Sequence, residues 1–182
     1  MAYSTIGQLS YMVLGAGMLT AAGMTGGLLH IAMHAFGKIT LFFCAGAIYV
    51  ASHKKYISEM DGLGRRMPVT YGAFLLGALS IIGIPPLGGF ISKWNLLLGA
   101  VEADQWVLLL VLLTSSLLNA AYFLPIVYRG FFAGPREAGA GEAIQEAPLL
   151  CLIPLTLTAL ASVGLFFFPG VFLELVHVAL FR

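Results

Sequence analysis

Five long apolar stretches, separated by short polar connections, set the pattern of the sequence. Several of them run close to 20 residues with at most one charged side chain, enough for a helix to cross about 30 Å of hydrocarbon. The expected spans are residues 6–23, 27–51, 69–101, 106–128 and 149–168. The pattern therefore predicts an all-α integral membrane protein with about five transmembrane helices in a single membrane domain over residues 1–182.

The third stretch is too long for one plain helix, and its middle contains Pro85, Pro86, Gly88 and Gly89. Proline lacks an N–H group and clashes with the preceding turn, so a helix must break here and leave carbonyl groups unpaired. Broken backbone at membrane depth is tolerated where it packs inside protein or lines a cavity, and transporters use such breaks to build ion sites. We expect two half-helices separated by a functional break.

Basic side chains outside the spans are concentrated in two connections, residues 52–67 and 129–147, whereas the connection after the third span carries Glu102 and Asp104. The positive-inside rule then places both basic loops and the N-terminus in the cytoplasm of a multi-pass protein of the cell's inner (plasma) membrane. Residues 171–182 have the spacing of a short helix lying at the membrane surface.

Composition agrees with lipid as the main solvent, since 60% of the residues are hydrophobic and 9% are charged. A net charge of +1 without a basic stripe argues against a nucleic-acid partner. Cys44 and Cys151 lie singly inside apolar runs, with no metal-ligand spacing. The sequence has no glycine-rich phosphate loop and no cysteine cluster. We expect no cofactor, no metal and no covalent chemistry in this chain.

The second stretch carries His30, His34 and Lys38 at intervals of four residues, which places all three on one face of a helix. A charged lysine at membrane depth costs at least a few kcal/mol, so this face is expected to line a hydrated interior. Imidazole and amine groups there suit a proton relay. The alternative is that His30 lies near the membrane surface and the other two only bond to neighbouring helices.

Lys93 follows the proline pair within the third stretch. Freed carbonyl groups and water beside a helix break would let its amine bind and release a proton as the surroundings change polarity. The alternative is a simple kink, with Lys93 extending to the membrane surface, but its central position in the span makes that extension difficult. We therefore interpret Lys93 as the proton store at the end of the relay.

Other polar side chains occur at the start of the first stretch and along the fourth. In membrane helices such residues most often bond across to a neighbouring helix, so packing is the expected role here. The residues concerned are Ser4, Thr5, Gln8, Tyr11, Thr114, Ser115, Ser116, Asn119 and Tyr122.

Four motifs in order, STIGQLSYM, HAFGKITLFFCAGAIY, ISEMDGLGRRMP and LSIIGIPPLGGFISKW, resemble the antiporter-like subunits of Mrp-type cation/proton antiporters and of respiratory complex I. The resemblance covers nearly all of the chain, and GRRMP with IPPLGGFISKW is most similar to the D-type subunit of Mrp antiporters. It implies a fourteen-helix fold with two inverted five-helix repeats, each with a broken helix and a half-channel for protons. This chain corresponds to the C-terminal repeat.

The resemblance also implies roles for individual residues. Lys93 is similar to the terminal lysine of the second broken helix, and His34 and Lys38 resemble the relay residues of the helix before it, with His30 at a position where histidine occurs. The first repeat, with its glutamate and paired lysine, has no counterpart here. The chain is thus expected to be a truncated product, a fragment or one piece of a split subunit.

The predicted function is proton translocation within a multisubunit cation/proton antiporter, through His30, His34 and Lys38 to Lys93. The expected partners are other membrane subunits, the lipid bilayer, and protons with sodium as an open alternative. One competing hypothesis is a proton-pumping subunit of a redox-driven complex, of the NADH-quinone oxidoreductase or membrane-bound hydrogenase type. Another is a non-conducting structural fragment whose polar residues only hold helices together.

Overall fold

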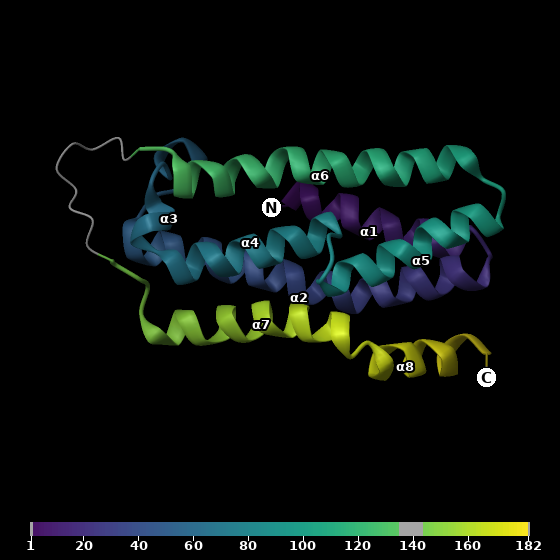
Figure 1. The fold of residues 1–182 in the computed structure, drawn as a ribbon. Helices are drawn as coiled ribbons and strands as arrows, with labels where there is room; N and C mark the ends of the chain where they lie inside the picture. Colours follow the sequence, from purple (N-terminus) through teal and green to yellow (C-terminus); the bar gives the residue numbers. More distant parts are fainter. Residues whose placement is uncertain (1, 135–143, 182) are drawn as a thin grey trace.

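The computed structural model describes residues 2–134 and 144–181, and this part of the chain contains helices and no strands (Figure 1). The elements in order are α1 Ala2–Gly17, α2 Ala21–Ser52, the short 3-10 turn η1 Ile57–Glu59, α3 Leu63–Arg66, α4 Pro68–Ile82, α5 Gly88–Glu102, α6 Trp106–Phe132, α7 Leu149–Phe167 and α8 Gly170–Phe181. The prediction of an all-α membrane fold is confirmed.

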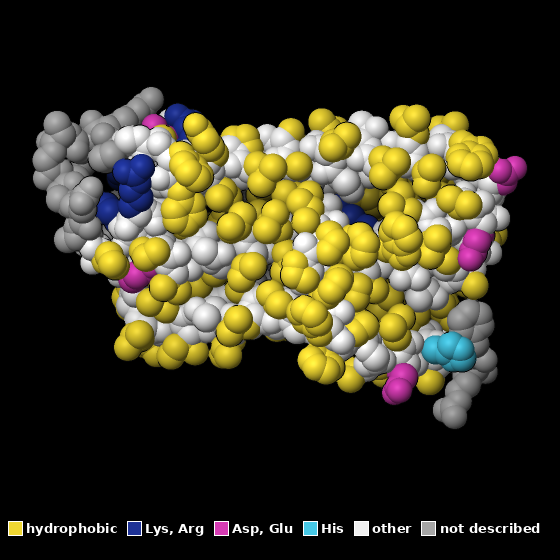
Figure 2. All heavy atoms as spheres, in the orientation of Figure 1, with side chains coloured by type: hydrophobic (Ala, Val, Ile, Leu, Met, Phe, Trp, Pro, Cys, Tyr) yellow, Lys and Arg dark blue, Asp and Glu magenta, His cyan; other side chains and the backbone are white. Residues whose placement is uncertain are grey.

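Three of these helices, α2, α6 and α7, are each long and apolar enough to cross a membrane. The pair α4 and α5 makes up the third predicted span as two half-helices, also as expected. Apolar side chains are spread along the whole visible flank of the bundle, and most charged ones lie at its two ends, apart from one basic patch midway along (Figure 2). This distribution is what a lipid-facing surface requires.

The first predicted span, residues 6–23, does not match one helix. Helix α1 ends at Gly17, and Thr20 caps the start of α2, its side chain accepting a hydrogen bond from the Gly23 N–H at 3.1 Å. Leu19 has a positive φ of 53°, which ends the first helix. The apolar run continues through this turn, so hydropathy alone did not reveal it. Helix α1 begins near the middle of the bundle (Figure 1).

Helix α2 is continuous over 32 residues and packs against α1, α4, α5, α7 and α8. Its buried face contains glycines that let neighbouring backbones approach closely. A side chain at Gly26 would meet the backbone of Leu96 on α5, and one at Gly15 of α1 would meet the backbone of Gly23 on α2. Small residues at helix contacts are the usual means of packing in membranes. Helix α2 therefore holds the bundle together.

The break in the third span runs from Gly83 to Leu87. Gly83 ends α4 in the left-handed conformation, with φ 90°. The Pro85–Pro86 bond that follows is cis. Gly88 and Gly89, which the sequence analysis assigned to the break, are instead the first two residues of α5. A side chain at Gly89 would overlap the carbonyl oxygen of Ser80 on α4, so glycine is needed here for close packing rather than for a turn.

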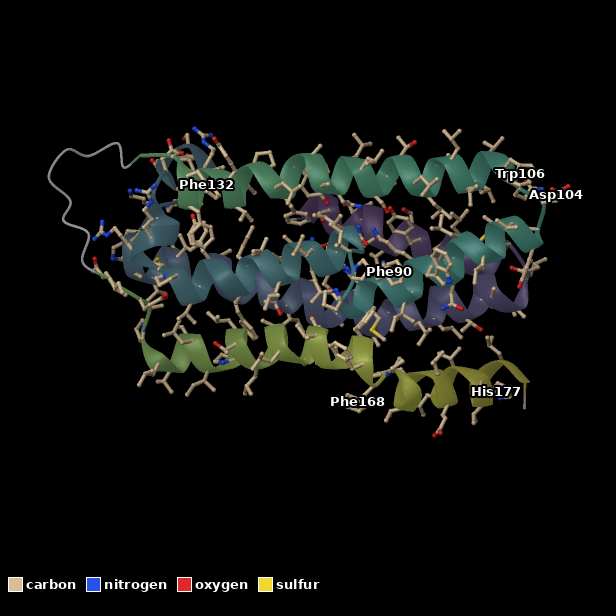
Figure 3. The ribbon with its side chains drawn as sticks, viewed as in Figure 1. Phe90, Asp104, Trp106, Phe132, Phe168 and His177 are labelled. Atoms are coloured by element: carbon tan, nitrogen blue, oxygen red, sulfur yellow. The ribbon has the colours of Figure 1, made fainter. Side chains whose placement is uncertain are left out.

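The first basic loop and the described residues of the second, 129–134 and 144–147, lie at one end of the bundle, and Asp104 at the other, as the charge distribution predicted (Figures 1 and 3). At the basic end the Arg129 Nε donates to an Asp61 carboxylate oxygen at 2.9 Å. Glu146 accepts from the Val69 N–H at 2.6 Å and from the Thr70 hydroxyl at 2.7 Å, which satisfies exposed donors at the start of α4. Asp61 of the first connection and Glu146 of the second are thus hydrogen-bonded to the end of α6 and the start of α4.

Helix α8, for which the sequence suggested a short helix at the membrane surface, runs on in roughly the direction of α7, along the side of the bundle (Figure 1). Val176 of α8 is buried in a cluster with Leu29 and Met33 of α2, and Phe172 and Leu180 pack against this cluster. The apolar face of α8 is therefore used for packing on α2.

Candidate proton-relay site

All four predicted relay side chains are buried inside the bundle. Their exposed fractions are 2% for His30, 8% for His34 and 5% for Lys38 on α2, and 6% for Lys93 on α5. None of the four side chains is exposed on the outside of the bundle. Titratable groups shielded in this way are costly and mark candidate functional sites in membrane proteins.

The stripe on α2 has the geometry that its spacing predicts. The rings of His30 and His34 stack, with centroids 5.9 Å apart and planes inclined by 18°. The Lys38 Nζ lies 6.0 Å from the ring centroid of Phe42. Neither the Lys38 Nζ nor the His34 Nδ1 has a hydrogen-bond partner among the described residues, although both atoms are buried. A charged ammonium in such surroundings is costly, which favours a group that exchanges its proton.

Lys93 is held at the helix break by backbone oxygens. Its ammonium donates to the carbonyl of Ile81 at 2.8 Å, to the carbonyl of Ile82 at 3.1 Å and to the Ser116 hydroxyl of α6 at 3.2 Å. The Nζ also lies 4.8 Å from the ring centroid of Tyr11. The two carbonyls belong to the last turn of α4, where no further helical N–H is available to them. The break therefore supplies the acceptors for a buried cation.

Gly83 also shapes this cradle. An added Cβ at Gly83 would lie 2.7 Å from the Lys93 Cδ, in a backbone conformation that already disfavours any other residue. The glycine thus ends α4 and leaves room for the lysine side chain that reaches back to it. The sequence pattern indicated the two prolines and the two later glycines as the helix break but did not indicate Gly83.

His30 is fixed by partners on two other helices. One ring nitrogen, Nδ1, lies 2.8 Å from the Ser92 hydroxyl of α5, and the other, Nε2, lies 3.0 Å from the Gln8 Oε1 of α1. Ser92 is fully buried, also donates to the Gly89 carbonyl at 3.0 Å, and directly precedes Lys93 in the chain. The stripe on α2 is therefore joined to the broken helix through Ser92.

A hydrogen-bonded series continues outward from His30. The Gln8 amide donates to the Asn119 Oδ1 at 3.3 Å, the Tyr122 hydroxyl also donates to that oxygen, and the Tyr122 oxygen lies 2.7 Å from the Ser4 hydroxyl. The series ends at a cavity of about 340 Å³ between α1 and α6, lined by Tyr3, Ser4, Gly7, Gln8, Ser115, Leu118, Asn119 and Tyr122. The side chains of Ser4, Gln8, Asn119 and Tyr122 bond across helices, and the series that they form leads to His30.

The structure does not join every predicted relay member. No direct hydrogen bond connects His34, Lys38 and Lys93 among the interactions of the described residues. Within residues 2–134 and 144–181, no three His, Cys, Asp or Glu side chains are grouped in a way that would hold a metal ion. The arrangement contains titratable groups and hydroxyls, and these can hold and pass protons.

The fold and site define a polytopic membrane protein with a broken helix and buried lysines at its centre. The family described as NADH:quinone oxidoreductase/Mrp antiporter, transmembrane, matches residues 1–119, and the chain belongs to this family. The resemblance to antiporter-like subunits that the motifs indicated is thus confirmed.

Named relatives agree with this assignment. The chain is 38% identical over 178 residues to NADH-quinone oxidoreductase subunit N of Desulforudis audaxviator, a match that covers 91% of this chain and 36% of that protein. It is 37% identical over 170 residues to NADH-quinone oxidoreductase subunit L of Rickettsia bellii, covering 93% of this chain and 25% of that protein. The chain therefore spans about a third or less of the length of these relatives.

Solved structures match over nearly the whole chain. A chain of respiratory complex I from Thermus thermophilus with bound NADH gives a TM-score of 0.82 with 28% identity, covering 97% of this chain and 37% of that chain. A chain of the Mrp complex from a Dietzia species gives a TM-score of 0.86 with 23% identity, covering 98% and 41%. The second likeness shows a shared fold.

Proposed function

We propose that this chain translocates protons across a membrane as one part of a multisubunit complex. The proposed route passes through His30, His34 and Lys38, with bound water, to Lys93. In this proposal Lys93 is the switchable proton store, and it exchanges with the face of the membrane near Glu102 and Asp104. The chain supplies the path, and partner subunits supply the driving reaction.

The observation that carries the proposal is the environment of Lys93. Lys93 is 6% exposed, and its ammonium donates to two carbonyl oxygens at a helix break. These acceptors stabilise a cation that would be costly in hydrocarbon. The acceptors are neutral, so no carboxylate among its hydrogen-bond partners fixes the charge. A small change in the distance from these carbonyls or in local hydration would then favour release of the proton.

Sequence relatives favour one kind of complex. The two relatives named above are subunits of NADH-quinone oxidoreductases, and another, 32% identical over 177 residues, is the F420H2 dehydrogenase subunit L of Methanosarcina mazei. These names favour the redox-driven alternative over a secondary Mrp-type antiporter. The match to the Mrp complex is a likeness of fold alone. We therefore propose membership of a redox-driven, proton-translocating complex, with sodium transport as the feature that would instead indicate an antiporter.

The proposed setting follows from the charge distribution. The basic end of the bundle faces the cytoplasm of a cell bounded by its inner (plasma) membrane, and Glu102 and Asp104 face the other side. The partners are further membrane subunits of the same complex.

The test is Lys93→Ala in the assembled complex, reconstituted into vesicles with a pH-sensitive dye inside. The substitution removes the buried charge together with the methylene chain of the lysine, so translocation is compared per assembled complex and should fall to the background of empty vesicles. Thr114→Val, at an exposed position on α6, is the matched control and should translocate normally. Normal translocation by an assembled Lys93→Ala complex would support the non-conducting structural alternative.

A further inference from the structure

A small polar cavity at the basic end of the bundle is separate from the relay. It has a volume of about 230 Å³ and is lined by Ala51, Ser52, Lys54, Leu63, Arg66, Met67 and Gln145. These residues come from the end of α2 and the loop after it, from α3 and the residue that follows it, and from the segment leading into α7. Because α2 and α7 are long enough to span a membrane, a cavity at this end of the two helices is where lipid headgroups would be expected.

Two cations line this cavity without an acidic partner. In the part of the chain that the structure describes, the ion pair at this end joins Arg129 to Asp61, and neither Lys54 nor Arg66 forms one. The nearby carboxylate of Glu146 is occupied by donors at the start of α4. Among the described residues, Lys54 and Arg66 therefore leave positive charge at the cavity without an ion-pair partner.

Arg66 is also held in place with a donor unused. One Nη of its guanidinium donates to the Gln145 Oε1 at 2.7 Å, and the Gln145 N–H donates back to the Arg66 carbonyl at 2.8 Å. The Arg66 Nε is buried and has no acceptor among the described residues. Leaving a charged donor buried without an acceptor is costly, and a bound anion would satisfy it.

We propose that this cavity binds a phosphate group, with Lys54 and Arg66 as its cationic contacts. A cavity of this size is too small for a folded partner and suits one headgroup. Guanidinium groups match phosphate oxygens, and basic pockets between membrane helices on the cytoplasmic side hold anionic headgroups. Two sources share this chemistry, the phosphodiester of an anionic phospholipid and free inorganic phosphate.

The test uses the full chain in nanodiscs of phosphatidylcholine, titrated with short-chain phosphatidylglycerol or with inorganic phosphate, and bound ligand is counted by native mass spectrometry. A direct contact between one of these cations and the phosphate contributes at least about 1 kcal/mol, a factor of about five in affinity. The double variant Lys54→Gln with Arg66→Gln should therefore bind about 25-fold more weakly than wild type. Each single variant should lose about fivefold, which keeps the test available if the double variant does not fold.

Lys55→Gln is the matched control, because it removes the same charge one residue away without touching the cavity, and it should change affinity less than twofold. Binding of phosphatidylglycerol that millimolar phosphate does not displace would assign the site to lipid, whereas displacement would assign it to free phosphate. Two results would overturn the proposal: equal losses in the cavity variants and in Lys55→Gln, or no binding of either ligand to the wild type.

Discussion

The Nδ1 of His30 and the hydroxyl of Ser92 lie 2.8 Å apart, and the same hydroxyl is 3.0 Å from the Gly89 carbonyl oxygen. A serine has one hydrogen to donate. When Ser92 donates to the Gly89 carbonyl, the Nδ1 of His30 must be protonated and donate to the serine oxygen. When Ser92 donates to His30, the Nδ1 must be deprotonated and accept. The direction in which the Ser92 hydroxyl donates therefore depends on whether the Nδ1 of His30 is protonated, and this couples His30 to the first turn of α5.

Ser92→Ala should remove this link and leave His30 without its partner on α5. We expect the stability of the protein to fall by about 1 to 3 kcal/mol, as for other lost hydrogen bonds of buried groups. The distinguishing measurement is the ¹⁵N chemical shift of the His30 ring nitrogens, which should show a changed tautomer balance. Ser92→Thr retains the hydroxyl and should retain the wild-type shifts; identical shifts in Ser92→Ala would show that Ser92 only packs.

Lys93→Arg separates a need for positive charge from a need for a titrating group. Arginine keeps the charge but does not release its proton at accessible pH, so translocation by the assembled complex should fall to background. Proton uptake into vesicles measures this outcome. Full translocation by Lys93→Arg would mean that the side chain acts as a fixed charge and that the relay ends elsewhere.

Gly83→Ala should displace Lys93 without changing any titratable group. The positive φ at this position costs a non-glycine residue about 1 to 2 kcal/mol, and the new Cβ would press on the lysine Cδ. We expect a lower midpoint of thermal unfolding in detergent together with slower proton translocation. Gly46→Ala provides the comparison, because a Cβ there meets nothing within 4 Å and alanine favours a helix interior, so its unfolding midpoint should stay at the wild-type value or rise.

Sequence reasoning succeeded where the physical constraint is local. Two adjacent prolines oblige a helix to break whatever surrounds it, and a lysine in an apolar helix must face the protein interior, so the break and the buried stripe could both be predicted. The residue at which the break ends could not be predicted in the same way, since Gly88 and Gly89 are compatible with a turn and with a tight helix contact.

The features that were missed depend on distant segments. Gln8 and Asn119 are 111 residues apart in sequence, and nothing in either helix alone indicates that they meet beside His30. Helix α8 has an apolar face that suits a membrane surface or a protein groove, and only the position of α2 decides between them. The turn after α1 was hidden because its residues are as apolar as the helices it joins.

Asn119→Leu tests whether the series from Gln8 to Tyr122 matters for the relay. The substitution keeps the approximate volume but deprives two donors of their shared acceptor. Each unsatisfied buried donor costs about 1 to 3 kcal/mol, so thermal stability should fall. Tyr122→Phe removes two bonds at the outer end, to Asn119 and to Ser4, but from a hydroxyl on a side chain that is 40% exposed, so it should have a smaller effect. If proton translocation per assembled complex is unchanged in Asn119→Leu, the series is structural.

The acceptors that hold Lys93 have a consequence for genetics. Two of the three, the oxygens of Ile81 and Ile82, belong to the main chain, and every amino acid at those positions would present the same carbonyl. A scan of side-chain substitutions would therefore detect Lys93 but would not detect the two backbone carbonyls that bind its ammonium. Replacing single amide linkages by esters, which weakens the carbonyl as an acceptor while sparing the side chain, is the kind of chemistry that can expose this hidden half of the site.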